Sequence, residues 1–122
     1  MKKLLFTSLL IFVAQSIFSQ TENAKFPNGD TAWKSFLNKN INQKIPLTNG
    51  APEGEYVVVV MFMIDKKGNI VQPFTTTKHG YGMEEEVVRV FKTSPQWIPG
   101  KKNGELTDSY RKQSITFIVT AD

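Results

Sequence analysis

The segment from Tyr56 to Ile64 limits the fold of this chain most, because it is an unbroken run of apolar residues. Two alternating sets of side chains make up the run: Tyr56, Val58, Val60, Phe62 and Ile64 on one face, and Val57, Val59, Met61 and Met63 on the other. β-Branched and aromatic residues favour strands. Apolar residues on both faces predict a strand that is central in its sheet or covered on both sides.

A hairpin is predicted directly after this strand. The polar segment Asp65-Lys66-Lys67-Gly68-Asn69 follows it, and Gly68 can take the positive φ that closes a tight turn. The return strand is expected over Ile70–Thr77. Pro73 removes one backbone donor from that strand, so the strand should lie at a sheet edge or contain a bulge.

The first of two helices is expected near the start of the domain. Its apolar face consists of residues spaced by three and four positions: Trp33, Phe36, Leu37 and Ile41. Asp30 or Asn28 offers a side-chain oxygen to cap its first turn. Pro46 is expected to prevent any continuation.

The second helix is expected before Pro95, with Met83, Val87, Val90 and Phe91 on one face. Glu84, Glu85 and Glu86 occupy its first turn, and basic residues lie toward its end. This charge order complements the helix dipole. We interpret the three carboxylates as a helix-start cluster, because consecutive residues on a helix point in different directions and do not form an acid–base pair.

The last strand is predicted over Ser109–Thr120, with Gln113, Ile115, Phe117 and Val119 on one face. The element order α-β-β-α-β predicts an α+β fold with two helices and a three-stranded antiparallel sheet. The strand order 2-1-3 places the most apolar strand in the centre. The last strand then has one open edge.

The sequence does not determine which element covers the second face of the central strand. If both helices lie on one side of the sheet, Val57, Val59, Met61 and Met63 need another cover, from the first helix or from a second copy of the chain. We interpret Met61 and Met63 as core-filling residues. The same interpretation applies to Trp33 and Trp97, since tryptophan buries a large area.

The N-terminus is typical of a secretory signal peptide. Lys2 and Lys3 precede a short apolar run that ends near Phe18, and one small residue, Ser19, separates it from a polar stretch. The run is shorter than the ~20 residues that span a bilayer. We expect residues 1–19 to be the signal, residues 20–25 a short polar tail and residues 26–122 the domain, exported to the periplasm.

Composition excludes several classes of function. The chain has no cysteine, so disulfides, thiolate metal sites and cysteine nucleophiles are absent. Its one histidine, His79, has glycine near it and is expected in a solvated loop, not as a metal ligand or catalytic base. We therefore expect no metal, no cofactor and no enzymatic activity. Lys and Arg number 15 against 11 Asp and Glu, without a dense basic patch, so no nucleic-acid partner is expected.

Two groups of motifs resemble the C-terminal domain of TonB proteins. The first is Phe26-Pro27-x-Gly29, then Gly54 and a strand ending in Phe62-x-Ile64-Asp65-x-x-Gly68. The second matches more closely, and is similar to the version common in exported proteins of Bacteroidetes: Gly82-Met83-Glu84-Glu85-Glu86-Val87-Val88-Arg89-Val90, then Ser94-Pro95-x-Trp97-x-Pro99-Gly100-Lys101-x-Asn103-Gly104.

This resemblance implies a function. TonB C-terminal domains bind the TonB box, an extended peptide at the N-terminus of TonB-dependent outer-membrane transporters, as a strand added to the last strand of the domain. An open strand edge is a template for such pairing, which is called β-augmentation. The resemblance therefore points to the following edge residues as the peptide-binding site: Ser114, Ile115, Thr116, Phe117, Ile118 and Val119.

Two features differ from a full TonB transducer and lead to an alternative. Only residues 20–25 lie between the predicted signal and the domain, where a transducer has an anchor and a proline-rich spacer. Ile45-Pro46 replaces the family's Tyr-Pro after the first helix. The alternative is an exported homodimer or cell-envelope scaffold, associated with peptidoglycan, without a role in energy transduction.

Overall fold

The computed structural model describes residues 20–121, so the predicted signal over residues 1–19 lies outside the described residues. In chain order its elements are β1 (Thr21–Glu22), α1 (Asp30–Asn40), α2 (Ile45–Thr48), β2 (Gly54–Ile64), β3 (Ile70–Thr75), α3 (Met83–Phe91), β4 (Gly100–Lys102), β5 (Glu105–Thr107) and β6 (Ser109–Val119). Within the described residues, no helix has both the length and the apolar character needed to cross a bilayer.

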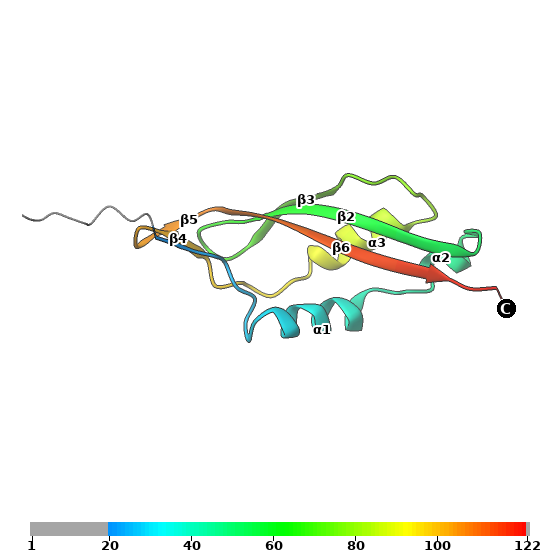
Figure 1. Ribbon diagram of the computed structural model, residues 1–122, viewed down its shortest axis with the longest axis horizontal. Coiled ribbons are helices and arrows are strands. Elements are labelled where there is room, and N and C mark those ends of the chain that lie inside the picture. Colours follow the sequence, from blue (N-terminus) through cyan, green and yellow to red (C-terminus); the bar gives the residue numbers. More distant parts are fainter. Residues whose placement is uncertain (1–19, 122) are drawn as a thin grey trace, which may run out of the picture.

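The main sheet has the order β3-β2-β6, and both pairings are antiparallel. The predicted α+β class and the 2-1-3 strand order are thus confirmed. β2 and β6 run side by side along the molecule (Figure 1), paired without interruption from Gly54 opposite Val119 to Ile64 opposite Ser109. The most apolar strand is central, as its composition requires.

β3 forms one edge of this sheet and carries the irregularity that Pro73 predicts. Its register with β2 shifts between Met61 and Met63, and Gln72 has a φ of 50°. The turn before it also agrees with the sequence, since Gly68 has a φ of 88°. Both expectations, an edge position and a bulge, are confirmed together.

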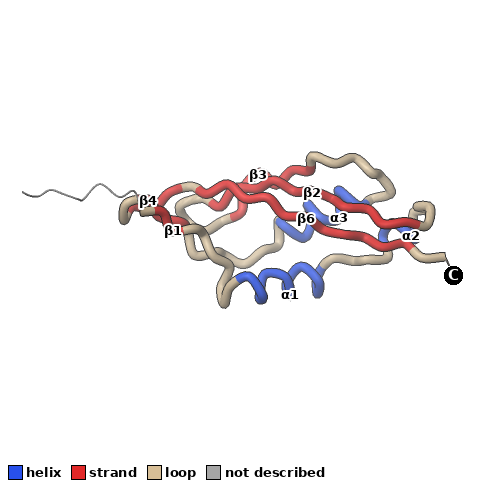
Figure 2. The backbone as a smooth tube through the Cα atoms, in the orientation of Figure 1, coloured by secondary structure: helices blue, strands red, loops and turns tan. Residues whose placement is uncertain are grey.

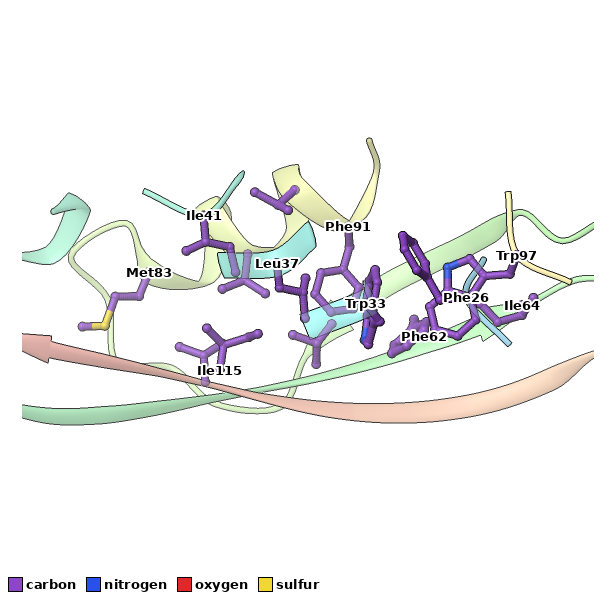
Figure 3. Packing of buried hydrophobic residues seen from close by; sticks show 14 of the residues in the cluster. Phe26, Trp33, Leu37, Ile41, Phe62, Ile64, Met83, Phe91, Trp97 and Ile115 are labelled. Atoms are coloured by element: carbon purple, nitrogen blue, oxygen red, sulfur yellow. The ribbon is translucent and has the colours of Figure 1, made fainter. Parts of the chain in front are cut away.

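The helices α1 and α3 pack on the same face of the main sheet. Figure 3 shows their side chains and those of β2 and β6 pointing toward one another in one buried cluster. The rings of Trp33 and Trp97 lie 4.8 Å apart at its centre, and each residue is at most 3% exposed. The interpretation of both tryptophans as core residues is confirmed.

Among residues 20–121, no helix lies over the opposite face of the sheet. Met61 and Met63 are half-buried there and lie outside the core cluster, so their interpretation as core-filling residues is wrong. Beside them Phe74 is 56% exposed and Tyr110 is 79% exposed. Of the two covers considered, the first helix does not supply one, because the Trp33 side of α1 packs against the other face.

A second, small sheet of order β1-β4-β5 lies at the end of the molecule remote from the C-terminus (Figure 2). It corrects two predictions. The segment over residues 20–25 is not a polar tail, because Thr21 pairs with Lys102 and Lys25 pairs with Ile98. The polar residues 101–108, whose composition predicts a loop, instead form most of the β4–β5 hairpin. Main-chain pairing does not depend on the polarity of the side chains, so the polar composition of these two segments gave no sign that they form strands.

The ends of α1 differ from the expected capping. Neither Asn28 nor Asp30 caps it: Gly29 is the capping residue, without a side-chain hydrogen bond. The helix ends at Asn40, and Pro46 lies in the first turn of α2. Proline is tolerated there because its missing N–H would have no partner within the helix.

Candidate functional site

β6 forms the second edge of the main sheet, and among residues 20–121 no strand pairs with its outer side. It is an uninterrupted strand of 11 residues, whereas β3 has 6 residues, a register shift and Pro73. Short length, bulges and proline are the usual protections of an edge strand. β3 has all three, and β6 has none.

The pairing of β2 shows which main-chain groups of β6 point outward. Val59 directs both of its main-chain groups toward β3: its oxygen accepts from Thr76 N–H at 3.0 Å and its N–H donates to Thr77 Oγ1 at 3.3 Å. Its partner in β6, Ser114, therefore cannot exchange main-chain hydrogen bonds with it. The N–H and C=O of Ser114 face the free edge.

The same alternation divides the six residues predicted for the site. Thr116 and Ile118 follow Ser114 at every second position, so their main-chain groups also face outward. The other three predicted residues pair with β2 and place their side chains in or beside the core: Ile115, Phe117 and Val119, which are at most 7% exposed. The structure therefore assigns the outward groups to Ser114, Thr116 and Ile118, and a structural role to the other three.

A groove of about 280 Å³ runs between this edge and α1. Residues of α1, of the segment after it and of β6 line the groove: Lys34, Leu37, Asn38, Ile41, Gln43, Gln113, Ser114, Ile115 and Thr116. α1 runs beside β6 in Figure 1. A strand added to β6 would therefore direct every second side chain toward α1. The only ionisable side chain in this lining is Lys34.

Gln113 is a residue of this edge that the sequence interpretation did not assign to the site. Its Oε1 accepts a hydrogen bond from the indole Nε1–H of Trp33 at 2.9 Å. Its Nε2 donates to the main-chain oxygen of Ser114 at 3.1 Å. One outward acceptor of β6 is thus bound to a side chain of the protein itself.

His79 lies in the loop before α3, as expected, and is half-buried there. Its Nε2 lies 2.7 Å from the oxygen of Val57, and its ring packs edge-on against Tyr56 with centroids 5.6 Å apart. The carboxylate of Glu84 accepts from the main-chain N–H groups of His79 and Gly80 at 2.8 and 3.0 Å. These bonds fix the loop before α3, which gives His79 a structural role at the β3 side of the sheet.

Glu86 is the one charged residue among the buried residues that the structure describes, with 7% of its surface exposed. Its carboxylate accepts two hydrogen bonds from Arg89, at 2.9 and 2.8 Å, and one from Asn42 N–H at 2.8 Å. The hydrogen bonds from Arg89 lower the pKa of Glu86 more than burial raises it. The pair joins α3 to the segment after α1, so the role of Glu86 is also structural.

The chemistry available at the β6 edge is hydrogen bonding and apolar contact. Within residues 20–121 no group of three or more His, Cys, Asp or Glu side chains is placed to hold a metal ion. Comparisons of the chain with protein-family models, with curated proteins and with solved structures find no match in any of the three. The resemblance to TonB C-terminal domains therefore stays a prediction from the sequence motifs.

Proposed function

We propose that this protein is a periplasmic module that binds an extended peptide by β-augmentation at the outer edge of β6. The observation that carries the proposal is the free edge itself, with the main-chain groups of Ser114, Thr116 and Ile118 directed away from β2. Outward N–H and C=O groups along an edge are a template for one more strand, and of these only the oxygen of Ser114 accepts from a side chain of the described residues.

The form of the edge favours a peptide ligand. Main-chain hydrogen bonds contribute affinity regardless of sequence, and each has a net value of about 0.5–1.5 kcal/mol. Binding also has to offset the ordering of a flexible peptide. We therefore expect weak binding from the main chain alone and selectivity from side chains that enter the groove beside Lys34 and Asn38.

The sequence motifs indicate the source of the peptide. The resemblance to TonB C-terminal domains favours the N-terminal segment of a TonB-dependent outer-membrane transporter. The predicted signal over residues 1–19 favours the periplasm, where such segments are exposed. We therefore propose a role in transport across the outer membrane, with the peptide segment as the direct ligand.

An amide NMR titration tests this proposal. Isotope-labelled protein is titrated with peptides from the N-terminal segments of outer-membrane transporters of the same cell. We expect saturable shifts that are largest along β6 and the facing side of α1. A well-dispersed spectrum that does not change at millimolar peptide, for every peptide tried, would contradict the proposal.

A second candidate function, a homodimeric scaffold, has its own supporting observation. The helix-free face of the sheet has an apolar depression of about 220 Å³, whose lining includes Met61, Met63, Val71, Phe74 and Tyr110. Burial of this face against a second copy would remove the exposed apolar area from water. Sedimentation velocity over a range of concentrations tests it. A dimer that Tyr110→Lys dissociates would support the scaffold, and a monomer at all concentrations would exclude it.

A further inference from the structure

The side chain of Gln113 connects the core of the protein to its free edge. Gln113 stands on the face of β6 that α1 covers, one residue before Ser114. Its amide oxygen is held by the indole N–H of Trp33, and its amide nitrogen donates to the oxygen of Ser114. We call this arrangement of three residues the Gln113 latch.

Trp33 makes the latch rigid at one end. It is 2% exposed, and its ring packs against four aromatic neighbours within 5.7 Å between centroids: Phe26, Phe36, Phe91 and Trp97. Because the indole cannot turn without disturbing this packing, the direction of its N–H is fixed. That N–H also decides the orientation of the Gln113 amide, with the oxygen toward Trp33 and the NH₂ toward the edge.

The latch occupies a hydrogen-bonding position that a bound strand needs. A strand paired along β6 would exchange bonds with the outward groups of Ile118, Thr116 and Ser114 in turn. Within residues 20–121 no strand pairs with the outward groups of Thr116 and Ile118, whereas the oxygen of Ser114 already accepts from Gln113. A strand that extends to Ser114 has to bring its own N–H to that oxygen beside the amide of Gln113, and so competes with the bond already formed.

From this geometry, and on the basis of the proposed function, we propose that Gln113 determines how far a bound peptide pairs along β6. While Gln113 is hydrogen-bonded to the oxygen of Ser114, peptide pairing is favoured at Thr116 and Ile118 and opposed at Ser114. Gln113 thereby affects the register of the bound peptide and the length over which it pairs, while the main chain of β6 forms the contact surface. The ligand class is therefore a short extended peptide whose pairing ends at Thr116. A peptide that binds more strongly through its other contacts can displace the amide of Gln113 and pair as far as Ser114.

Gln113→Glu tests the latch most cleanly. The carboxylate still accepts from Trp33 Nε1–H, but it has no N–H to donate to Ser114. Uncharged peptides of two lengths are compared by calorimetry, one that reaches Ser114 and one truncated opposite Thr116. Since no side-chain N–H then competes for the oxygen of Ser114, we expect the long peptide to bind the variant about 2- to 10-fold more tightly than the wild type. The short peptide should bind both proteins equally.

Gln113→Met serves as the second variant, because it removes the same donor without adding charge. The indole N–H resonance of Trp33 verifies that each variant is folded. Equal affinities of wild type and both variants for the long peptide would overturn the latch and leave peptide binding intact. Absence of binding by both peptides to all three proteins would overturn the proposed function, and the latch with it.

Discussion

Gly68 and Trp97 are joined by a main-chain contact that leaves no room for a side chain. Trp97 N–H donates to the oxygen of Gly68 at 2.7 Å, and a Cβ built on Gly68 would overlap the oxygen of Trp97. The contact connects the β2–β3 turn to the segment that follows α3. It places Trp97 against Trp33, which in turn carries the hydrogen bond to Gln113 at the free edge.

Gly68→Ala is expected to lower the free energy of unfolding by about 2–4 kcal/mol, from the positive φ and the steric overlap together. Gly104→Ala is the matched control. Gly104 has a φ of 83°, similar to the 88° of Gly68, but its Cβ would meet no atom within 4 Å. The control should lose only about 1 kcal/mol. Urea unfolding measures both, and equal losses would show that the contact with Trp97 contributes nothing.

The exchange of amide hydrogens along β6 should alternate. Ser114, Thr116 and Ile118 direct their N–H groups to the free edge, so their amides should exchange rapidly in the absence of ligand. The amides of Ile115 and Phe117 pair with β2 and should be protected. Hydrogen exchange followed by NMR measures this pattern. Uniform protection along the strand would mean that another element or a second copy covers the edge.

Thr116→Pro should weaken peptide binding at least tenfold without unfolding the protein. Proline removes an N–H that faces outward, so no bond to β2 is lost, and edge strands accept proline at such positions. Thr75→Pro is the control on the other edge. Thr76 donates to Val59, so the N–H of Thr75 faces away from β2. Thr75 lies two residues after Pro73, which the same strand already contains. Calorimetric titration should show wild-type affinity for the control, and an equal loss in both variants would argue against binding at β6.

Glu86→Gln should reduce stability in a pH-dependent way. The pKa of Glu86 is lowered in the folded protein from the ordinary value of 4.5, mainly by the hydrogen bonds from Arg89. A lowered pKa stabilises the fold above about pH 4.5, and this stabilisation is lost as the pH falls through the folded-state pKa. At pH 7 we expect a loss of about 1 kcal/mol, because Arg89 is largely exposed and water screens the pair.

Urea unfolding at several pH values checks this prediction. The difference in stability between wild type and Glu86→Gln should decrease as the pH falls below 4.5. Glu85→Gln, an exposed residue of the same helical turn, is the control and should change stability little at any pH. A difference for Glu86→Gln that does not vary with pH would mean that its ionisation is not coupled to folding.

The main sheet and the two longer helices followed from side-chain patterns in the sequence. Alternation from Tyr56 to Ile64, the turn at Gly68 and the missing donor of Pro73 have direct physical consequences, and the structure has each of them. The small sheet was missed for an equally physical reason. β1, β4 and β5 are held by main-chain pairing over two or three residues each, too few for a periodic pattern in the side chains.

The candidate site was predictable only in part. The sequence indicated the open edge of the last strand, but not which residues direct their main chain outward. That depends on the register between β2 and β6, which pairs Val59 with Ser114 and which side-chain alternation alone does not determine. Gln113 had a signal that could have been used: it is an amide on the same face as Ile115 and Phe117, where a polar group needs a partner.

Pairing of a peptide with β6 through its main chain is tested most directly by an N-methyl scan of a bound peptide. Each variant peptide is methylated at one backbone nitrogen, which removes that donor and leaves the side chains unchanged. In a strand, alternate N–H groups face the partner. We expect the dissociation constant to vary in an alternating pattern, with loss of binding at every second position, and no such pattern with the Thr116→Pro protein. Equal effects at consecutive positions, or no effect at any position, would contradict it.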